Sequence, residues 1–312
     1  MTRWAPDVPA LARRKALHLG EPGQRWLAGL DDLIAELQRK WSLTVLEPLT
    51  GGSASYVLRV RTADHRDAVL KLPLPGEDVA SQVATLGRAH GRGYVSLLAY
   101  DPVRNAMLLE ALGPSMDQLG WPPERAIEIL CRTLRQAWRV PRPANLTVTP
   151  EQEKAGQLGR LVARLWEELG RPCTERVVTQ ALRFARQRAA SFDPDRCVVV
   201  HGDPHPGNAL QVTTPRTGAE SGFVFVDPDG FLADPAYDCG VVLRDWYTSL
   251  IAGDTVSLAR RYCRLLAGHA GVEDAAVWEW GFLERVSTGL YLMSFGAEDA
   301  GLRFLAVAER LV

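Results

Sequence analysis

The residues best suited to chemistry in this sequence lie in one polar loop, VVVHGDPHPGN at 198–208. Asp203 and Asn208 belong to this loop, and Asp227 follows nineteen residues after Asn208 in the string FVFVDPDG. A carboxylate beside a hydroxyl can accept its proton, and an amide oxygen with a second carboxylate can bind the magnesium ions that bridge phosphates. Phosphoryl transfer needs this set of groups. We therefore predict Asp203 as the catalytic base, with Asn208 and Asp227 as metal ligands.

These side chains can act together only if the chain returns on itself. The short apolar runs ALQV and FVFV, separated by a Gly/Thr/Ser-rich turn, predict a β-hairpin that brings Asp227 back to the loop. Pro204, Pro206 and Gly207 restrict the path of the loop between Asp203 and Asn208. We expect His201 to brace the loop by hydrogen bonding rather than to take part in the reaction.

The string HGDPHPGN followed by VDPDG resembles the catalytic loop of the aminoglycoside phosphotransferase family. DPAYDCG at 234–240 and WGFLERVSTGLYLMSFG at 280–296 are similar to its streptomycin 6-kinase and hydroxyurea phosphotransferase branch, and the resemblance covers about residues 45–296. It implies an α+β, bilobal protein-kinase-like fold, with a small antiparallel sheet in the N-lobe and a mainly helical C-lobe. It also implies ATP and Mg²⁺ as cofactors, a small hydroxylated molecule as acceptor, and Asp238 as a support for the loop.

Hydrophobic periodicity is consistent with these two lobes. Apolar residues at helical spacing predict a helix over 24–40, and alternating segments over 43–72 predict a β-meander. Gly113-Pro114 interrupts the pattern, so we expect an N-terminal nucleotide-binding lobe at 1–112 and a C-terminal lobe at 113–312. Further elements are expected as a helix at 79–90, strands at 95–100, 106–112 and 197–200, and helices within 123–138, within 151–190 and from about 235 onward.

On the nucleotide side, the resemblance implies a strand lysine that faces the phosphates, and Lys71 in AVLKL matches the V-A-I-K pattern of kinases. The turn GGSAS at 51–55 would lie over the phosphates, with donors from its backbone and from Ser53 or Ser55. Related kinases pair the lysine with a helical glutamate, but Gln82 stands at that position here. The partner of Lys71 stays open between Gln82 and Glu77.

The run MLLEALGP at 107–114 resembles the segment that holds adenine, with Glu110 to Leu112 as expected contacts through main-chain groups. The acceptor is expected at the helical C-lobe. From Val241 to the end of the chain there are nine acidic and seven basic residues, so the charges nearly balance. This balance does not require the acceptor to be strongly cationic. Candidate acceptor residues are Asp245, Trp246, Glu284 and Arg285.

Composition excludes several other classes of protein. The net charge is −1 and no long run of Lys or Arg occurs, which gives little support for nucleic-acid binding. Five widely spaced cysteines favour reduced thiols over a disulfide framework. Neither a signal-peptide core nor an apolar stretch of about twenty residues is present, so we expect a cytoplasmic protein with no membrane partner. No protein partner is implied.

Two alternatives compete with the kinase interpretation. His201, Asp203 and His205 form an H-x-D-x-H pattern that could imitate the ligands of a metal-dependent hydrolase, although such sites need further ligands from elsewhere. A pseudokinase that binds nucleotide without turnover is the second, because a glutamine replaces the helical glutamate. The presence of Lys71 together with the loop residues argues against it.

Overall fold

The computed structural model describes residues 8–49, 55–77, 79–143, 148 and 153–312. The chain divides into two compact units, the first formed by residues up to Gly91 with Val95–Gly113, and the second by Arg92–Tyr94 with Pro114–Val312. The boundary expected after residue 112 lies one residue before this division. Residues 92–94 join the second unit because Gly93 exchanges hydrogen bonds with it, donating to Gly218 O at 2.7 Å and accepting from Phe225 N at 2.9 Å.

The first unit contains the expected antiparallel sheet, with strand order β1-β2-β3-β5-β4. The predicted helices at 24–40 and 79–90 are confirmed as α2 and α3, whereas α1 was not foreseen. The strand expected at 106–112 ends at Glu110. The elements of this unit are α1 (Ala10–His18), α2 (Glu21–Trp41), β1 (Thr44–Pro48), β2 (Ser55–Arg61), β3 (Asp67–Pro73), α3 (Ala80–Ala89), β4 (Leu97–Asp101) and β5 (Ala106–Glu110).

The core of the first unit lies between α2 and the sheet. Leu30, Ile34 and Leu37 form one apolar face of α2 at helical spacing and are buried. They pack in one cluster with alternate residues of the central strands, including Tyr56 and Leu70. Because side chains alternate across a strand, this packing determines which face of β3 is covered by α2.

The second unit is mainly helical, as the family resemblance implied. In the segment predicted as helical at 151–190, the described residues from 153 onward form two helices, which Gly170 and the residues after it separate. Its elements are η1 (Met116–Leu119), α4 (Pro123–Ala137), α5 (Lys154–Glu168), α6 (Glu175–Ala190), β6 (Val198–Val199), η3 (Pro206–Asn208), β7 (Ala209–Gln211), β8 (Phe223–Phe225), β9 (Leu232–Ala233), α7 (Ala236–Arg244), α8 (Tyr247–Ala252), α9 (Thr255–Ala270), α10 (Asp274–Ser294) and α11 (Glu298–Arg310).

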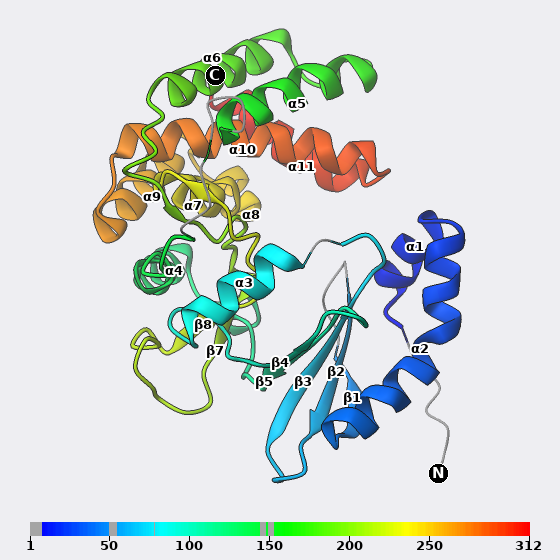
Figure 1. The fold of residues 1–312 in the computed structure, drawn as a ribbon. Coiled ribbons are helices and arrows are strands. Elements are labelled where there is room, and N and C mark those ends of the chain that lie inside the picture. The colour runs from blue at the N-terminus through cyan, green and yellow to red at the C-terminus, as the bar shows by residue number, and fades with distance from the viewer. Residues whose placement is uncertain (1–7, 50–54, 78, 144–147, 149–152) are drawn as a thin grey trace. The chain divides into compact units, whose positions relative to one another are not determined.

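Helix α10 is the centre of the second unit. It carries apolar residues on all of its faces and packs against α5, α6, α7, α9 and α11 (Figure 1). A helix that is apolar all round must be covered on every side, which explains this central place. None of the helices in the described part of the chain combines the length and the apolar character needed to cross a membrane.

Helices α7 and α10 cross closely at two glycines. A Cβ atom on Gly240 would lie 2.4 Å from the Cβ of Trp280, and one on Gly281 would lie 2.8 Å from Leu243. Larger residues at these positions would push the helices apart. One turn beyond the crossing, Arg244 on α7 and Glu284 on α10 face each other, with Nη1 of Arg244 2.9 Å from Oε2 of Glu284.

Candidate active site

The polar loop after β6 is anchored by one buried carboxylate, that of Asp238 near the start of α7. Its Oδ2 accepts hydrogen bonds from His201 N at 2.9 Å and Trp138 Nε1 at 2.8 Å, and its Oδ1 accepts one from Gly202 N at 2.9 Å. Burial raises the pKa of Asp238 to about 6, while these three donors favour the ionised form. Asp238 therefore holds the backbone directly before Asp203.

His201 is fully buried and links both ends of the loop. Its Nε2 lies 2.8 Å from the carbonyl oxygen of Val226, and its Nδ1 accepts a hydrogen bond from Asp203 N at 3.1 Å. Since a carbonyl can only accept, Nε2 carries the proton and the ring is neutral. Burial lowers the pKa of His201 to about 4, and Tyr94 and Phe225 pack against the ring. This placement agrees with the expectation that His201 braces the loop.

The neutral state of His201 predicts a pH-dependent stability. Its pKa in the folded protein, about 4, is below the 6.5 of the unfolded chain, so its contribution is complete above pH 6.5 and is lost as the pH falls toward 4. At pH 5.5 this loss is about 1.4 kcal/mol relative to pH 7.5. Urea unfolding at both pH values measures it. Between pH 7.5 and pH 5.5, His201→Gln, whose side chain cannot titrate, should lose about 1.4 kcal/mol less stability than the wild type. An equal loss of stability in both proteins would contradict a buried, neutral His201.

Asn208 and Asp227 are brought to Asp203 by the hairpin β7–β8. The side-chain Nδ2 of Asn208 donates to the backbone carbonyl oxygen of Asp203 at 2.9 Å. The backbone carbonyl oxygen of Asn208 accepts a hydrogen bond from Val226 N at 2.9 Å. Val226 is thus held by both Asn208 and His201, which places the next residue, Asp227, beside the loop. Asp227 has φ 57°, a left-handed conformation that aspartate adopts more readily than most residues.

The orientation of Asn208 suits a magnesium ligand. Because Nδ2 is used by the loop carbonyl, the amide oxygen points away from that bond, and amide and carboxylate oxygens are the ligands that Mg²⁺ prefers. No cluster of three or more His, Cys, Asp or Glu side chains arranged to hold a metal occurs among the residues that the structure describes. A magnesium ion held by one amide oxygen, one carboxylate, phosphate oxygens and water would need no such cluster.

His205, which the hydrolase alternative would use as a ligand, is engaged within the loop. Its Nδ1 accepts a hydrogen bond from Gly207 N at 3.1 Å, and its Nε2 lies 3.5 Å from Oδ2 of Asp203. The ring therefore closes the turn of η3 and supports the carboxylate of Asp203. This arrangement uses both nitrogens and disfavours a metal-ligating role.

The sequence reasoning missed Arg244, which pairs directly with Asp203. Nη2 of Arg244 contacts Oδ1 of Asp203, while Nη1 contacts Glu284, whose other oxygen accepts a hydrogen bond from Tyr237 at 2.6 Å. Burial raises the pKa of Asp203, but Arg244 and the histidines of the loop lower it more, so the pKa lies below its ordinary value. Asp203 is ionised at neutral pH. A charged residue in the apolar run CGVVLRDW was the signal for Arg244.

Asp229 is a second residue that the sequence reasoning did not assign. Its backbone N donates to His201 O at 2.7 Å, and its carboxylate lies over Gly202, where an added Cβ would be 2.4 Å from Oδ2 of Asp229. A residue larger than glycine at 202 would displace this carboxylate from the vicinity of Asp203. The repeated aspartate in VDPDG was the available signal.

The four acceptor candidates surround Arg244 unequally. Asp245 lies 3.8 Å from Nε of Arg244, and its pKa is raised by burial against the opposing effect of Arg244. Trp246 adopts φ 69° and packs edge-on against Tyr262. Glu284 is 4% exposed and is shielded by Arg244. Of these four candidates, Asp245 and Trp246 are partly exposed to solvent, whereas Glu284 and Arg285 are buried.

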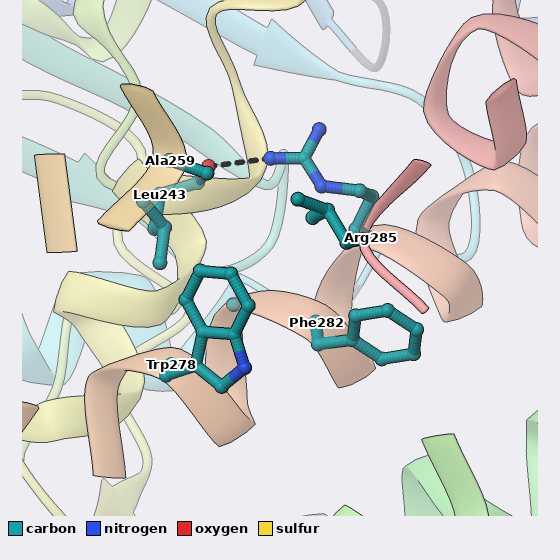
Figure 2. Close-up of a pocket in the computed structure, with 7 residues that line it drawn as sticks. Leu243, Ala259, Trp278, Phe282 and Arg285 are labelled. Carbon is teal, nitrogen blue, oxygen red and sulfur yellow. Dashed lines mark hydrogen bonds between the residues drawn. The ribbon is translucent and has the colours of Figure 1, made fainter. Parts of the chain in front are cut away.

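Arg285 points into the interior instead of toward solvent. It is 1% exposed, and Nη2 donates to the carbonyl oxygen of Leu243 at 2.6 Å, at the end of α7 (Figure 2). Trp278 and Phe282 border a cavity of about 10 Å³ beside it, enough for roughly one water molecule. Arg285 therefore stabilises the backbone next to Arg244, and this cavity is too small for an acceptor.

In the first unit, Lys71 lies on β3 and is 8% exposed. Its Nζ is 3.4 Å from Oε1 of Gln82 on α3, whereas Glu77 lies in an exposed turn. Of the two partners left open, the structure thus places Gln82 beside the lysine. Ser55 begins β2 and is buried, and Ser53 lies outside the described residues.

Glu110 and Leu112 occupy the end of β5 and the connection that follows. Glu110 is tied to Ser96, whose backbone N donates to Oε1 of Glu110 at 2.9 Å and whose carbonyl oxygen accepts from Glu110 N at 3.1 Å. Leu112 is half-buried in a segment without regular secondary structure. The Glu110 side chain therefore stabilises the strand end.

Comparison with known proteins supports this architecture. The family model described as aminoglycoside/hydroxyurea antibiotic resistance kinase matches residues 40–294. Streptomycin 6-kinase of Streptomyces glaucescens is 29% identical and covers 98% of this chain and 97% of its own. Hydroxyurea phosphotransferase of Kitasatospora aureofaciens is 27% identical, with 98% and 86% covered. The predicted resemblance to this branch is confirmed.

Solved structures show the fold. Ethanolamine kinase of Plasmodium vivax aligns with a TM-score of 0.63 at 11% identity, covering 98% of this chain and 95% of that one. Spectinomycin phosphotransferase, bound to ADP and spectinomycin, aligns with a TM-score of 0.57 at 13% identity, covering 90% and 98%. The predicted kinase-like fold is confirmed. Because the family model matches most of its length, the chain belongs to the aminoglycoside/hydroxyurea antibiotic resistance kinases, a family of small-molecule phosphotransferases.

Proposed function

We propose that this protein is an ATP- and Mg²⁺-dependent phosphotransferase that moves the γ-phosphate of ATP to a hydroxyl of a streptomycin-like aminoglycoside. The observation that carries the proposal is the set of hydrogen bonds joining Asp203, Asn208 and Val226 around His201. In the proposal, this network holds Asp203 as the base, and Asn208 and Asp227 as oxygen ligands, in one loop and the hairpin that follows it. The streptomycin 6-kinase relatives favour this acceptor class.

In the proposed reaction, Asp203 orients the acceptor hydroxyl and takes its proton. The new oxygen–phosphorus bond forms as the bond between the γ-phosphorus and the β,γ-bridging oxygen of ATP breaks, which releases ADP. Arg244 holds Oδ1 of Asp203, so the carboxylate keeps one direction toward the hydroxyl. Asn208 and Asp227 would hold Mg²⁺, which when bound neutralises charge on the phosphates. Lys71 would bind the phosphates with backbone donors of the GGSAS turn, and the segment at Glu110–Leu112 would hold adenine.

The test is an ATP-consumption assay over a panel of acceptors. Purified protein with ATP and MgCl₂ is offered streptomycin, other aminoglycosides, amino sugars, hydroxyurea and small polyols. We expect consumption that depends on acceptor and on Mg²⁺, greatest with streptomycin. Preference for hydroxyurea or an amino sugar would reassign the acceptor within the same chemistry. ATP binding without consumption, for any acceptor, would instead indicate a pseudokinase.

The hydrogen bond between Lys71 and Gln82 predicts the effect of restoring the usual acid. In Gln82→Glu, a carboxylate replaces the amide oxygen 3.4 Å from Nζ, so the lysine keeps its position and gains an ion pair. We expect kcat/KM for ATP to stay the same or to rise a few-fold, because a charged partner strengthens such a hydrogen bond. Gln82→Leu, the matched control without an acceptor, should lose activity. A loss in the glutamate variant like that in the leucine variant would show that the pair does not position Lys71.

A further inference from the structure

One face of α10 runs from the buried ion-pair network to the protein surface. Glu284, Thr288, Tyr291 and Phe295 are separated by four, three and four residues. At about 100° per residue, all four point within an arc of roughly 60°. Burial falls steadily along this face: Glu284 is 4% exposed, Thr288 is intermediate, Tyr291 is 49% exposed and Phe295 is 61% exposed.

The inner half of this face belongs to the environment of Asp203. Oγ1 of Thr288 lies 3.3 Å from Nη1 of Arg244, and Arg244 pairs with Asp203. Tyr291 lies one turn beyond Thr288, and side chains three or four residues apart on a helix are neighbours. From Glu284, Tyr291 is about 10 Å and Phe295 about 16 Å along the helix axis. To reach both, an acceptor with its hydroxyl at Asp203 would have to span this length along α10.

The two aromatic side chains form a pair at the surface. Their ring centroids are 4.6 Å apart and the rings are tilted by 72°, an edge-to-face contact. Single exposed apolar residues are common and need no explanation. Two large rings in contact, on the helix face that carries Glu284 and Thr288, offer a stacking surface for a ligand ring.

The surroundings of the pair favour a cationic ligand. Tyr291 and Phe295 lie at the C-terminal end of α10, the end at which the helix dipole carries its partial negative charge. Glu298 and Asp299, both exposed, follow in the first turn of α11. Aromatic faces attract guanidinium and ammonium groups, and the two carboxylates, a few residues further along the chain, carry the complementary charge.

From this continuity and charge we infer that Tyr291 and Phe295, with Glu298 and Asp299, form a subsite for a cationic ring of the acceptor, remote from the hydroxyl that receives phosphate. The inference rests on the proposed function, because it places the acceptor hydroxyl at Asp203. It predicts selectivity for ring-bearing guanidino or amino acceptors. A molecule of a few heavy atoms, such as hydroxyurea, cannot occupy both places at once.

The test compares streptomycin with hydroxyurea in the double variant Tyr291→Ala/Phe295→Ala. Isothermal titration of streptomycin into the full-length protein should show a Kd raised about tenfold or more, the loss expected for two aromatic contacts with a cation. Any turnover of hydroxyurea should change less than twofold. Val256→Ala, which removes another exposed apolar side chain in the same unit, should leave both unchanged. Equal melting temperatures check that the variants are folded.

Two further variants test the chemistry of the pair. Tyr291→Phe should retain streptomycin affinity, whereas Tyr291→Leu/Phe295→Leu should lose most of it, because leucine keeps apolar area but has no aromatic face. Full affinity in the leucine variant would overturn the cationic subsite. So would a change of less than twofold in the alanine variant, an absence of streptomycin binding to the wild type, or a dimer that the alanine variant abolishes.

The outcomes separate this inference from the proposed function. Streptomycin binding that depends on the aromatic pair, without any phosphate transfer, would support the subsite and contradict the proposed catalysis. Phosphate transfer to streptomycin that is equally fast in the wild type and the alanine variant would support the proposed catalysis and contradict the subsite. Binding and turnover are therefore measured on the same preparations.

Discussion

Asp203→Asn is expected to lower kcat by a factor of about 10²–10⁴, the usual contribution of a positioned proton acceptor. The amide has nearly the shape of the carboxylate, and its oxygen can still accept a hydrogen bond from Arg244. It cannot take a proton from the acceptor hydroxyl. The measurement is ATP consumption with the best acceptor from the panel, at saturating ATP and MgCl₂.

The affinity for ATP should change little in this variant, because the proposed nucleotide contacts are made by other residues. Titration of ATP into the wild type and the variant checks this. Asp195→Asn removes an exposed carboxylate from the loop before β6 and should leave kcat unchanged. Turnover in Asp203→Asn within tenfold of the wild type would remove Asp203 from the role of base.

Asp238→Ala should destabilise the second unit strongly. Three donors, His201 N, Gly202 N and Trp138 Nε1, would lose their acceptor in a fully buried place. Each unsatisfied buried donor costs about 1–3 kcal/mol, so we expect a loss of at least about 3 kcal/mol in the free energy of unfolding. That is a large part of the roughly 5–15 kcal/mol that stabilises a typical domain. Urea unfolding measures it.

The same variant should lose activity, since the loop before Asp203 is no longer held. Asp238→Asn keeps the shape and one acceptor oxygen and should lie between the wild type and the alanine variant in both stability and kcat. Asp195→Ala, at an exposed position before β6, is the matched control and should change stability by less than about 0.5 kcal/mol. A loss below about 1 kcal/mol in Asp238→Ala would show that water replaces the carboxylate.

Residues close together in the chain were predictable because local rules govern them. The turn-forming prolines and glycine between Asp203 and Asn208 limit the loop to few conformations, and the alternating runs around the hairpin lead back to Asp227. Helix and strand periodicity likewise predicted α2, α3 and the sheet of the first unit, apart from α1 and the exact strand ends. In each case the deciding interactions span a few residues.

Contacts between distant segments were not predictable in the same way. Arg244 pairs with Asp203, about forty positions before it, and with Glu284, about forty positions after it. These contacts depend on the close crossing of α7 and α10 at Gly240 and Gly281. The apolar run before Arg244 indicates a buried helix end, but it does not show which carboxylates the guanidinium meets. The burial of Arg285 and the choice of Gln82 over Glu77 depend in the same way on packing between elements.

The sequence alone therefore determined the reaction class, because the groups that phosphoryl transfer needs lie in one short loop and the hairpin after it. The tertiary structure decided how that chemistry is tuned: which cation holds Asp203, and which face of α10 leads outward from it. The physical reason is that hydrogen-bonding and turn preferences act over a few residues, whereas the position of a charged side chain between two helices follows from the packing of the whole unit.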